Sequence, residues 1–100
     1  MATVSADLDT LEALYNTLKA NVQKCDDIQK TTDSSLESAV WQSKNADDFR
    51  TQWADFKPKL VSFEQVFASA ASDVATNHNN IATANGEKDR PVLAPVEAIA

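Results

Sequence analysis

Apolar residues recur alternately three and four positions apart along two long stretches of this chain, and this spacing restricts its fold more than any other feature. The positions are Leu11, Tyr15, Leu18 and Val22 in the first stretch, and Phe49, Trp53, Phe56, Leu60, Phe63, Phe67 and Val74 in the second. Such a repeat places about one side chain per turn on one helix face. Only one of the 100 residues is glycine, so turns must be few. The sequence therefore predicts an all-α fold, an antiparallel helix-turn-helix hairpin.

Helix signals set the expected boundaries. Residues 1–86 are predicted to form the hairpin, with helices over about 7–36 and 45–85 and a turn over about 37–44. Asn45 suits an N-cap, and Gly86 can adopt the left-handed conformation that ends many helices. Pro58 falls on the water-facing side of the repeat, so we expect it to bend the second helix without breaking it. Residues 87–100 are predicted to form a flexible C-terminal tail.

The repeat residues are expected to pack either in the hairpin core or in a dimer seam. Leu14 and Ile28 lie beside the first stripe and widen it, which suits a four-helix bundle better than an isolated pair of helices. In the polar break between the stripes, Trp41 either covers the end of the hairpin or belongs to a recognised surface. Both interpretations remain open at this point.

The second helix is longer than the first and leaves Ile81 without a partner in its own chain. This overhang predicts either a second subunit or a tail that folds back. Beyond Gly86 the tail contains two prolines, Pro91 and Pro95, among apolar residues. It is either disordered or a short linear motif, whose partner contacts would be Val92, Leu93, Val96 and Ile99.

Charge and hydropathy exclude several partners. The formal net charge is −6 and no basic stripe occurs, which argues against nucleic-acid binding and against an anionic membrane surface. No apolar run approaches the roughly 20 residues that a membrane-spanning helix requires. The stretch 1–9 contains no Lys or Arg and does not resemble a signal peptide. We therefore expect either a cytoplasmic protein or export by a route that does not read such a signal.

No catalytic, cofactor-binding or metal-binding site is predicted. Cys25, the only cysteine, occupies a seam position, and His78, the only histidine, lies far along the second helix. Nucleophilic catalysis needs a base beside the thiol, and no Glu-x-x-His pattern accompanies His78. The acidic pair Asp26 and Asp27 points to different sides of a helix. The sequence indicates a protein that is not an enzyme.

Taken together, the length, the predicted hairpin and the central Trp41-Gln42-Ser43 resemble the WXG family of early-secreted-antigen-like proteins. These are hairpins of roughly one hundred residues from actinobacteria and firmicutes. The likeness extends to about Asn85 and includes the segment 45–60, which follows the turn. Two features depart from the family pattern: Ser43 replaces the glycine of Trp-x-Gly, and the segment 81–85, from Ile81 to Asn85, lacks the Tyr-x-x-x-Asp/Glu export signal.

The resemblance implies a homodimer, or a heterodimer with a related hairpin, that forms an antiparallel four-helix bundle. It also implies secretion without a signal peptide as a substrate or co-substrate of the type VII system, through contact with its membrane ATPase. A partner subunit could supply the missing signal. The alternative is an intracellular adaptor or structural bundle protein that is not exported.

Overall fold

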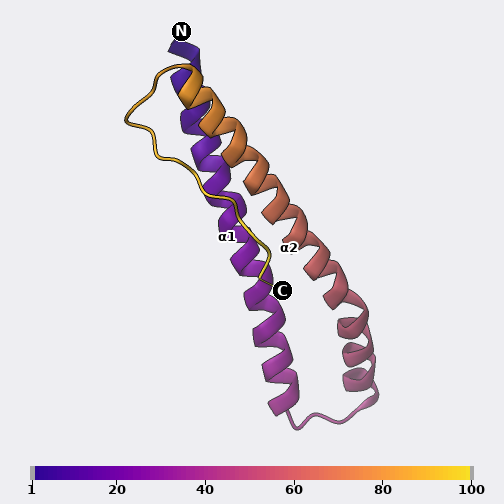
Figure 1. The fold of residues 1–100 in the computed structure, drawn as a ribbon. Helices are drawn as coiled ribbons and strands as arrows, with labels where there is room; N and C mark the ends of the chain where they lie inside the picture. Colours follow the sequence, from indigo (N-terminus) through magenta and orange to yellow (C-terminus); the bar gives the residue numbers. More distant parts are fainter. Residues whose placement is uncertain (1, 100) are drawn as a thin grey trace.

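Two long helices and a returning C-terminal segment make up the computed structural model, which describes the backbone of residues 2–99 and the side chains of residues 8–99. Helix α1 spans Ala2–Ser38 and α2 spans Lys44–Ala84. The helices run antiparallel and the chain after α2 turns back along them, as Figure 1 shows. The described residues contain no strand, so the predicted all-α hairpin is confirmed.

The turn between the helices is tightened by a side-chain cap. The hydroxyl oxygen of Ser43 accepts a hydrogen bond from the Ala46 amide at 3.1 Å, which satisfies one of the free donors at the start of α2. Ser43 therefore takes the N-cap role that the sequence assigned to Asn45. Its backbone is extended, with φ −171°, a conformation open to any residue, so the turn does not require glycine at this position.

Helix α2 continues through Pro58, and a glycine follows its C-terminal cap. Pro58 is exposed on the outer side, so its missing N–H costs no buried hydrogen bond. After Asn85, Gly86 adopts φ +67°, and the Glu87 amide donates to the Ala82 carbonyl oxygen at 2.9 Å. The left-handed residue reverses the chain direction and sends the following segment back over the hairpin.

The seam between the helices agrees with the expected positions on α1 but is rotated on α2. Tyr15 and Val22 are buried, and Leu11 and Leu18 are half-buried. On α2 the buried positions are Ala46, Leu60, Glu64, Ala68, Ala71, Ala75, His78 and Ala82. Beyond Leu60 this series runs one residue ahead of the predicted one, which corresponds to about 100° around the helix. Small alanines allow the two backbones to approach closely, whereas the prediction followed the largest apolar side chains.

A small core joins all three segments near the middle of the hairpin. Tyr15 from α1 and Ala71 and Ala75 from α2 are buried together. Leu93 and Val96 of the returning segment pack against this cluster. We call residues 90–99 the strap. Whereas a flexible tail was predicted, the strap lies on the helices and supplies part of the core.

Candidate functional site

The hairpin presents two faces of different character on opposite sides of the seam. On α2, Ser72 lies eight residues after the buried Glu64, which places Ser72 about 80° to one side of the seam. Phe63 precedes Glu64 by one residue and therefore lies about 100° to the other side. The strap binds the side that carries Ser72. Phe63 therefore lies on the side away from the strap.

The side away from the strap exposes large apolar residues on both helices. We call this the apolar face: Leu14 and Ile28 are each 46% exposed, and Phe49, Phe56 and Phe63 are 40%, 46% and 56% exposed. Leu14 comes one residue before the buried Tyr15 on α1, just as Phe63 comes one residue before the buried Glu64 on α2. On two antiparallel helices, residues that precede a seam residue by one position lie on the same side of the helix pair. Leu14 and Phe63 therefore belong to the same face. Near the turn, Phe49 of α2 shares one surface hollow with Thr32 and Leu36 of α1.

Three of the predicted seam residues therefore do not pack in the core of this chain. Phe49, Phe56 and Phe63 recur at intervals of seven on the outer flank of α2, where a further hollow of about 410 Å³ lies between Phe49, Trp53 and Phe56. The other seam residues of α2 are better covered: Leu60 is buried, and Trp53, Phe67 and Val74 are half-buried. Phe49, Phe56 and Phe63 therefore lie on the surface of the single chain, outside its core.

Trp41 borders this face at the end of the hairpin. Its ring lies 6.1 Å from that of Phe49 and 5.9 Å from the Arg50 guanidinium, measured between group centres. Arg50 also donates to the Trp41 carbonyl oxygen at 3.0 Å. The indole is 41% exposed, so it covers the start of α2 and also presents a surface. Gln42 beside it is exposed.

On the opposite side, helix side chains bind the backbone of the strap at regular intervals. Asn79 donates to the Leu93 carbonyl oxygen and accepts from the Leu93 amide, both at 2.9 Å. The Ser72 hydroxyl pairs in the same way with the amide and carbonyl of Val96, both at 2.9 Å. A carboxylate oxygen of Glu64 accepts the Ile99 amide at 2.8 Å. The strap runs antiparallel to α2 (Figure 1).

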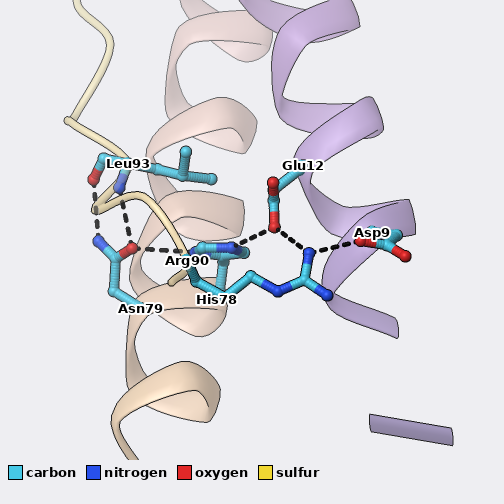
Figure 2. A network of polar contacts seen from close by, with 6 residues as sticks. All are labelled: Asp9, Glu12, His78, Asn79, Arg90 and Leu93. Carbon is cyan, nitrogen blue, oxygen red and sulfur yellow. Dashed lines mark hydrogen bonds and ion pairs between the residues drawn. The ribbon is translucent and has the colours of Figure 1, made fainter. Parts of the chain in front are cut away.

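Tyr15 and an ion-pair network complete what we call the strap site, whose helix residues are Asp9, Glu12, Tyr15, Glu64, Ser72 and Asn79. The Tyr15 hydroxyl donates to the Ala94 carbonyl oxygen at 2.7 Å. At the other end of the strap, Arg90 donates to Glu12 at 2.9 Å and also pairs with Asp9. Figure 2 shows Arg90 reaching from the strap to both carboxylates of α1.

His78 connects this network to the strap. The imidazole is completely buried; Nε2 lies 2.9 Å from a Glu12 carboxylate oxygen and Nδ1 lies 3.0 Å from Asn79 Oδ1 (Figure 2). Asn79 Oδ1 accepts a hydrogen bond from the Leu93 amide, which fixes the orientation of the Asn79 side-chain amide. Because this oxygen has no hydrogen to donate, its contact with His78 Nδ1 requires a hydrogen on Nδ1.

Hydrogen bonding within the network favours the ionised form of Glu12. The bond from His78 holds the pKa of the Glu12 carboxyl below its ordinary value, and Arg90 adds to this effect while burial opposes it. The sequence showed no ligand pattern around His78 and placed it far along the second helix. Its partners are 66 residues away in Glu12 and one residue away in Asn79, so no local motif could have indicated the network.

The remaining predicted contact residues have different environments. Leu93 and Val96 are held by the strap site, whereas Val92 is 85% exposed and Ile99 is half-exposed. Ile81 is half-buried, and Asn85 is exposed and caps α2. The structure thus divides the predicted contact set between internal packing and free surface.

The thiol of Cys25 is buried in the seam, and burial, with the Glu64 carboxylate, raises its pKa. Among residues whose side chains are described, no three His, Cys, Asp or Glu are arranged to hold a metal ion. Neither helix, within the described part of the chain, has an apolar stretch long enough to cross a membrane. Comparison with known proteins found no matching family model, no matching curated protein and no matching solved structure.

Proposed function

We propose that this chain is a non-enzymatic protein–protein interaction module that pairs through its apolar face into a four-helix bundle. The observation that carries the proposal is the position of that face. Leu14 and Ile28 on α1 and Phe49, Phe56 and Phe63 on α2 are exposed on the side that the strap leaves open. A stripe that spans two antiparallel helices is complementary to another two-helix surface.

The spacing of the phenylalanines favours a second copy of this chain as the occupant. Phe49 and Phe63 each lie seven residues from Phe56, so an antiparallel pairing of two α2 helices centred on Phe56 sets Phe49 of each copy against Phe63 of the other. In the same pairing, Lys59 approaches Asp55 of the opposite copy. Such self-complementarity is the signature of a two-fold symmetric interface. A related but different hairpin is the second candidate partner.

Phe56→Asp is expected to abolish the dimer, because it places a charge at the centre of the apolar interface. Truncating a central aromatic anchor commonly costs about 2 kcal/mol or more, a weakening of roughly 30-fold or greater. Sedimentation equilibrium of wild type and variant at micromolar concentrations measures the effect. Helix content by circular dichroism should be unchanged, since Phe56 is exposed within one chain.

Val40→Asp is the matched control, because Val40 is 99% exposed in the turn and lies outside the apolar face. This variant should dimerise like wild type. A wild-type chain that remains monomeric at 100-fold higher concentration would exclude the second copy. Capture of a related hairpin that depends on Phe56 would then identify the second candidate partner.

The resemblance to WXG proteins extends the proposal to export. We infer that the paired hairpins leave the cell without a signal peptide, as substrate or co-substrate of a type VII secretion system. Deleting the secretion ATPase of the source organism is expected to remove the protein from the culture supernatant, as measured by quantitative proteomics, while its level inside the cell remains. An unchanged extracellular level contradicts export by this route and favours the intracellular adaptor.

A further inference from the structure

Four strap residues that contact the hairpin recur at every third position, and the Ala94 carbonyl, which Tyr15 binds, lies between two of them. Arg90 pairs with Asp9 and Glu12, Leu93 and Val96 are each bound through both backbone groups, and the Ile99 amide donates to Glu64. Pro91 and Pro95 fall between these positions, where no amide hydrogen is needed. A polyproline II helix has three residues per turn, so a three-residue repeat with interspersed prolines is typical of an extended segment of this kind.

The spacing of the helix side chains matches this period. Asn79 and Ser72 are seven residues apart, about 10.5 Å along α2, and Ser72 and Glu64 are eight apart, about 12 Å. Three residues of extended chain cover roughly 9–10 Å. Two turns of α2 therefore advance by nearly the same distance as one period of the strap. Each period meets a polar helix side chain that can bind its backbone.

Recognition at this surface is directed mainly at the backbone, with two side-chain selections. Leu93 and Val96 pack against the cluster of Tyr15, Ala71 and Ala75. The paired carboxylates of Asp9 and Glu12 select a basic residue three positions before Leu93. The helices already contact each other along their own seam beneath the strap. The surface thus has the character of a peptide-binding site that is filled by its own chain.

We propose that the strap site is a binding site for extended peptides in which a basic residue is followed at every third position by Leu, Val and Ile, and that its external ligand is the strap of a second copy. A second copy carries the identical segment. Within one chain, only residues 85–89 tie the strap to the end of α2. Exchange between copies therefore replaces every contact by an equivalent one.

The direct test uses a fluorescent peptide of residues 88–100 and full-length protein. The variant Leu93→Asp/Val96→Asp removes the strap from its own site and leaves the helix residues unchanged. Fluorescence anisotropy should show binding to this variant and at least 100-fold weaker apparent binding to wild type, whose tethered strap competes at an effective concentration of about millimolar. Adding Asn79→Ala should weaken the peptide about 10- to 100-fold, because two hydrogen bonds to Leu93 are lost.

Matched variants separate this site from general effects. Asn77→Ala is the control for Asn79→Ala, because the Asn77 amide bonds only to Asp73 of its own helix. Val92→Asp is the control for the strap substitutions, since Val92 is exposed, and this chain should exclude the peptide as wild type does. If circular dichroism shows that the double aspartate variant loses its helices, Leu93→Ala/Val96→Ala takes its place. A folded strap variant that fails to bind the peptide overturns the proposal, and so does binding that Asn79→Ala leaves unchanged.

Exchange between copies is tested by mixing two full-length variants. Asn79→Ala/Ser72→Ala keeps a normal strap on a weakened site, and Leu93→Asp/Val96→Asp keeps a normal site without a competent strap. The mixture should form a complex, seen by sedimentation, that exceeds the self-association of either variant alone. Peptide binding without such a complex rejects the second copy as ligand. The apolar face is unchanged in both variants, so pairing through Phe56 contributes equally to all three samples and its failure is distinguishable.

Discussion

Glu12→Ala is expected to lower the free energy of unfolding by about 3 kcal/mol, because it leaves the buried His78 ring without its acceptor. For a chain of this size that loss corresponds to a fall in Tm of roughly 12–24 °C. Glu12 receives hydrogen bonds from both His78 and Arg90, which come from α2 and from the strap. Urea denaturation of dilute protein, followed by circular dichroism, gives the difference.

Glu37→Ala provides the matched control. Glu37 also lies on α1 but is exposed near its end, so the change should stay within about 0.5 kcal/mol. Glu12→Gln should fall between the two, since the amide oxygen can still accept one hydrogen bond without carrying charge. If Glu12→Ala unfolds at the same urea concentration as Glu37→Ala, the network contributes no stability.

The Glu12 carboxylate also makes the stability of the fold depend on pH in the acid range. Its pKa is depressed in the folded chain, so its contribution is fully present above the ordinary value of 4.5 and is lost as pH falls through 4.5 towards the lower folded value. Asp9, His78 and Arg90 are the charged or titratable groups in its network. Stability of wild type should therefore fall more steeply below about pH 5 than that of Glu12→Gln, as measured by Tm across pH. Parallel curves would assign the acid sensitivity to other carboxyl groups.

The hairpin itself could be predicted from the sequence, because one glycine and two heptad-like stripes allow few other arrangements. The rotation of the α2 seam could not, because the pattern gave weight to Phe63 and Val74 while close helix packing selected Ala71 and Ala75. An alanine carries little hydrophobic signal, although it permits the closest approach of two backbones. That rotation moves Phe63 out of the seam, and Phe63 joins Phe49 and Phe56 on the apolar face.

The strap was the feature that was hardest to predict from the sequence. Asn79 and Ser72 bind backbone groups of the strap, so the residue types of the strap do not indicate this contact. His78 and Glu12 are 66 residues apart in the sequence, so their contact could not be predicted either. One signal was available: Leu93, Val96 and Ile99 recur every third residue among prolines. That period matches two turns of a helix, but reading it in this way requires knowing that the chain reverses at Gly86.

Tyr15→Ala should destabilise the chain by about 3–5 kcal/mol, the usual cost of removing a buried aromatic ring. Tyr15 is the residue at which α1, α2 and the strap meet: it packs with Ala71 and Ala75, and its hydroxyl donates to Ala94. Its removal leaves a cavity and also loosens the strap, so residues 90–99 should lose protection in hydrogen–deuterium exchange along with the loss in unfolding free energy.

Two further variants divide this effect into its parts. Tyr15→Phe retains the ring and removes only the bond to Ala94, for an expected loss of about 1 kcal/mol. Leu14→Ala, at the neighbouring position, lies on the apolar face and should change the stability of dilute monomer by less than about 1 kcal/mol while weakening dimerisation. A Tyr15→Ala chain whose strap stays protected would show that Asn79, Ser72 and the Arg90 ion pairs hold the strap without the core. A Leu14→Ala chain that loses monomer stability but dimerises normally would contradict the division of the hairpin into a strap-covered side and a pairing side.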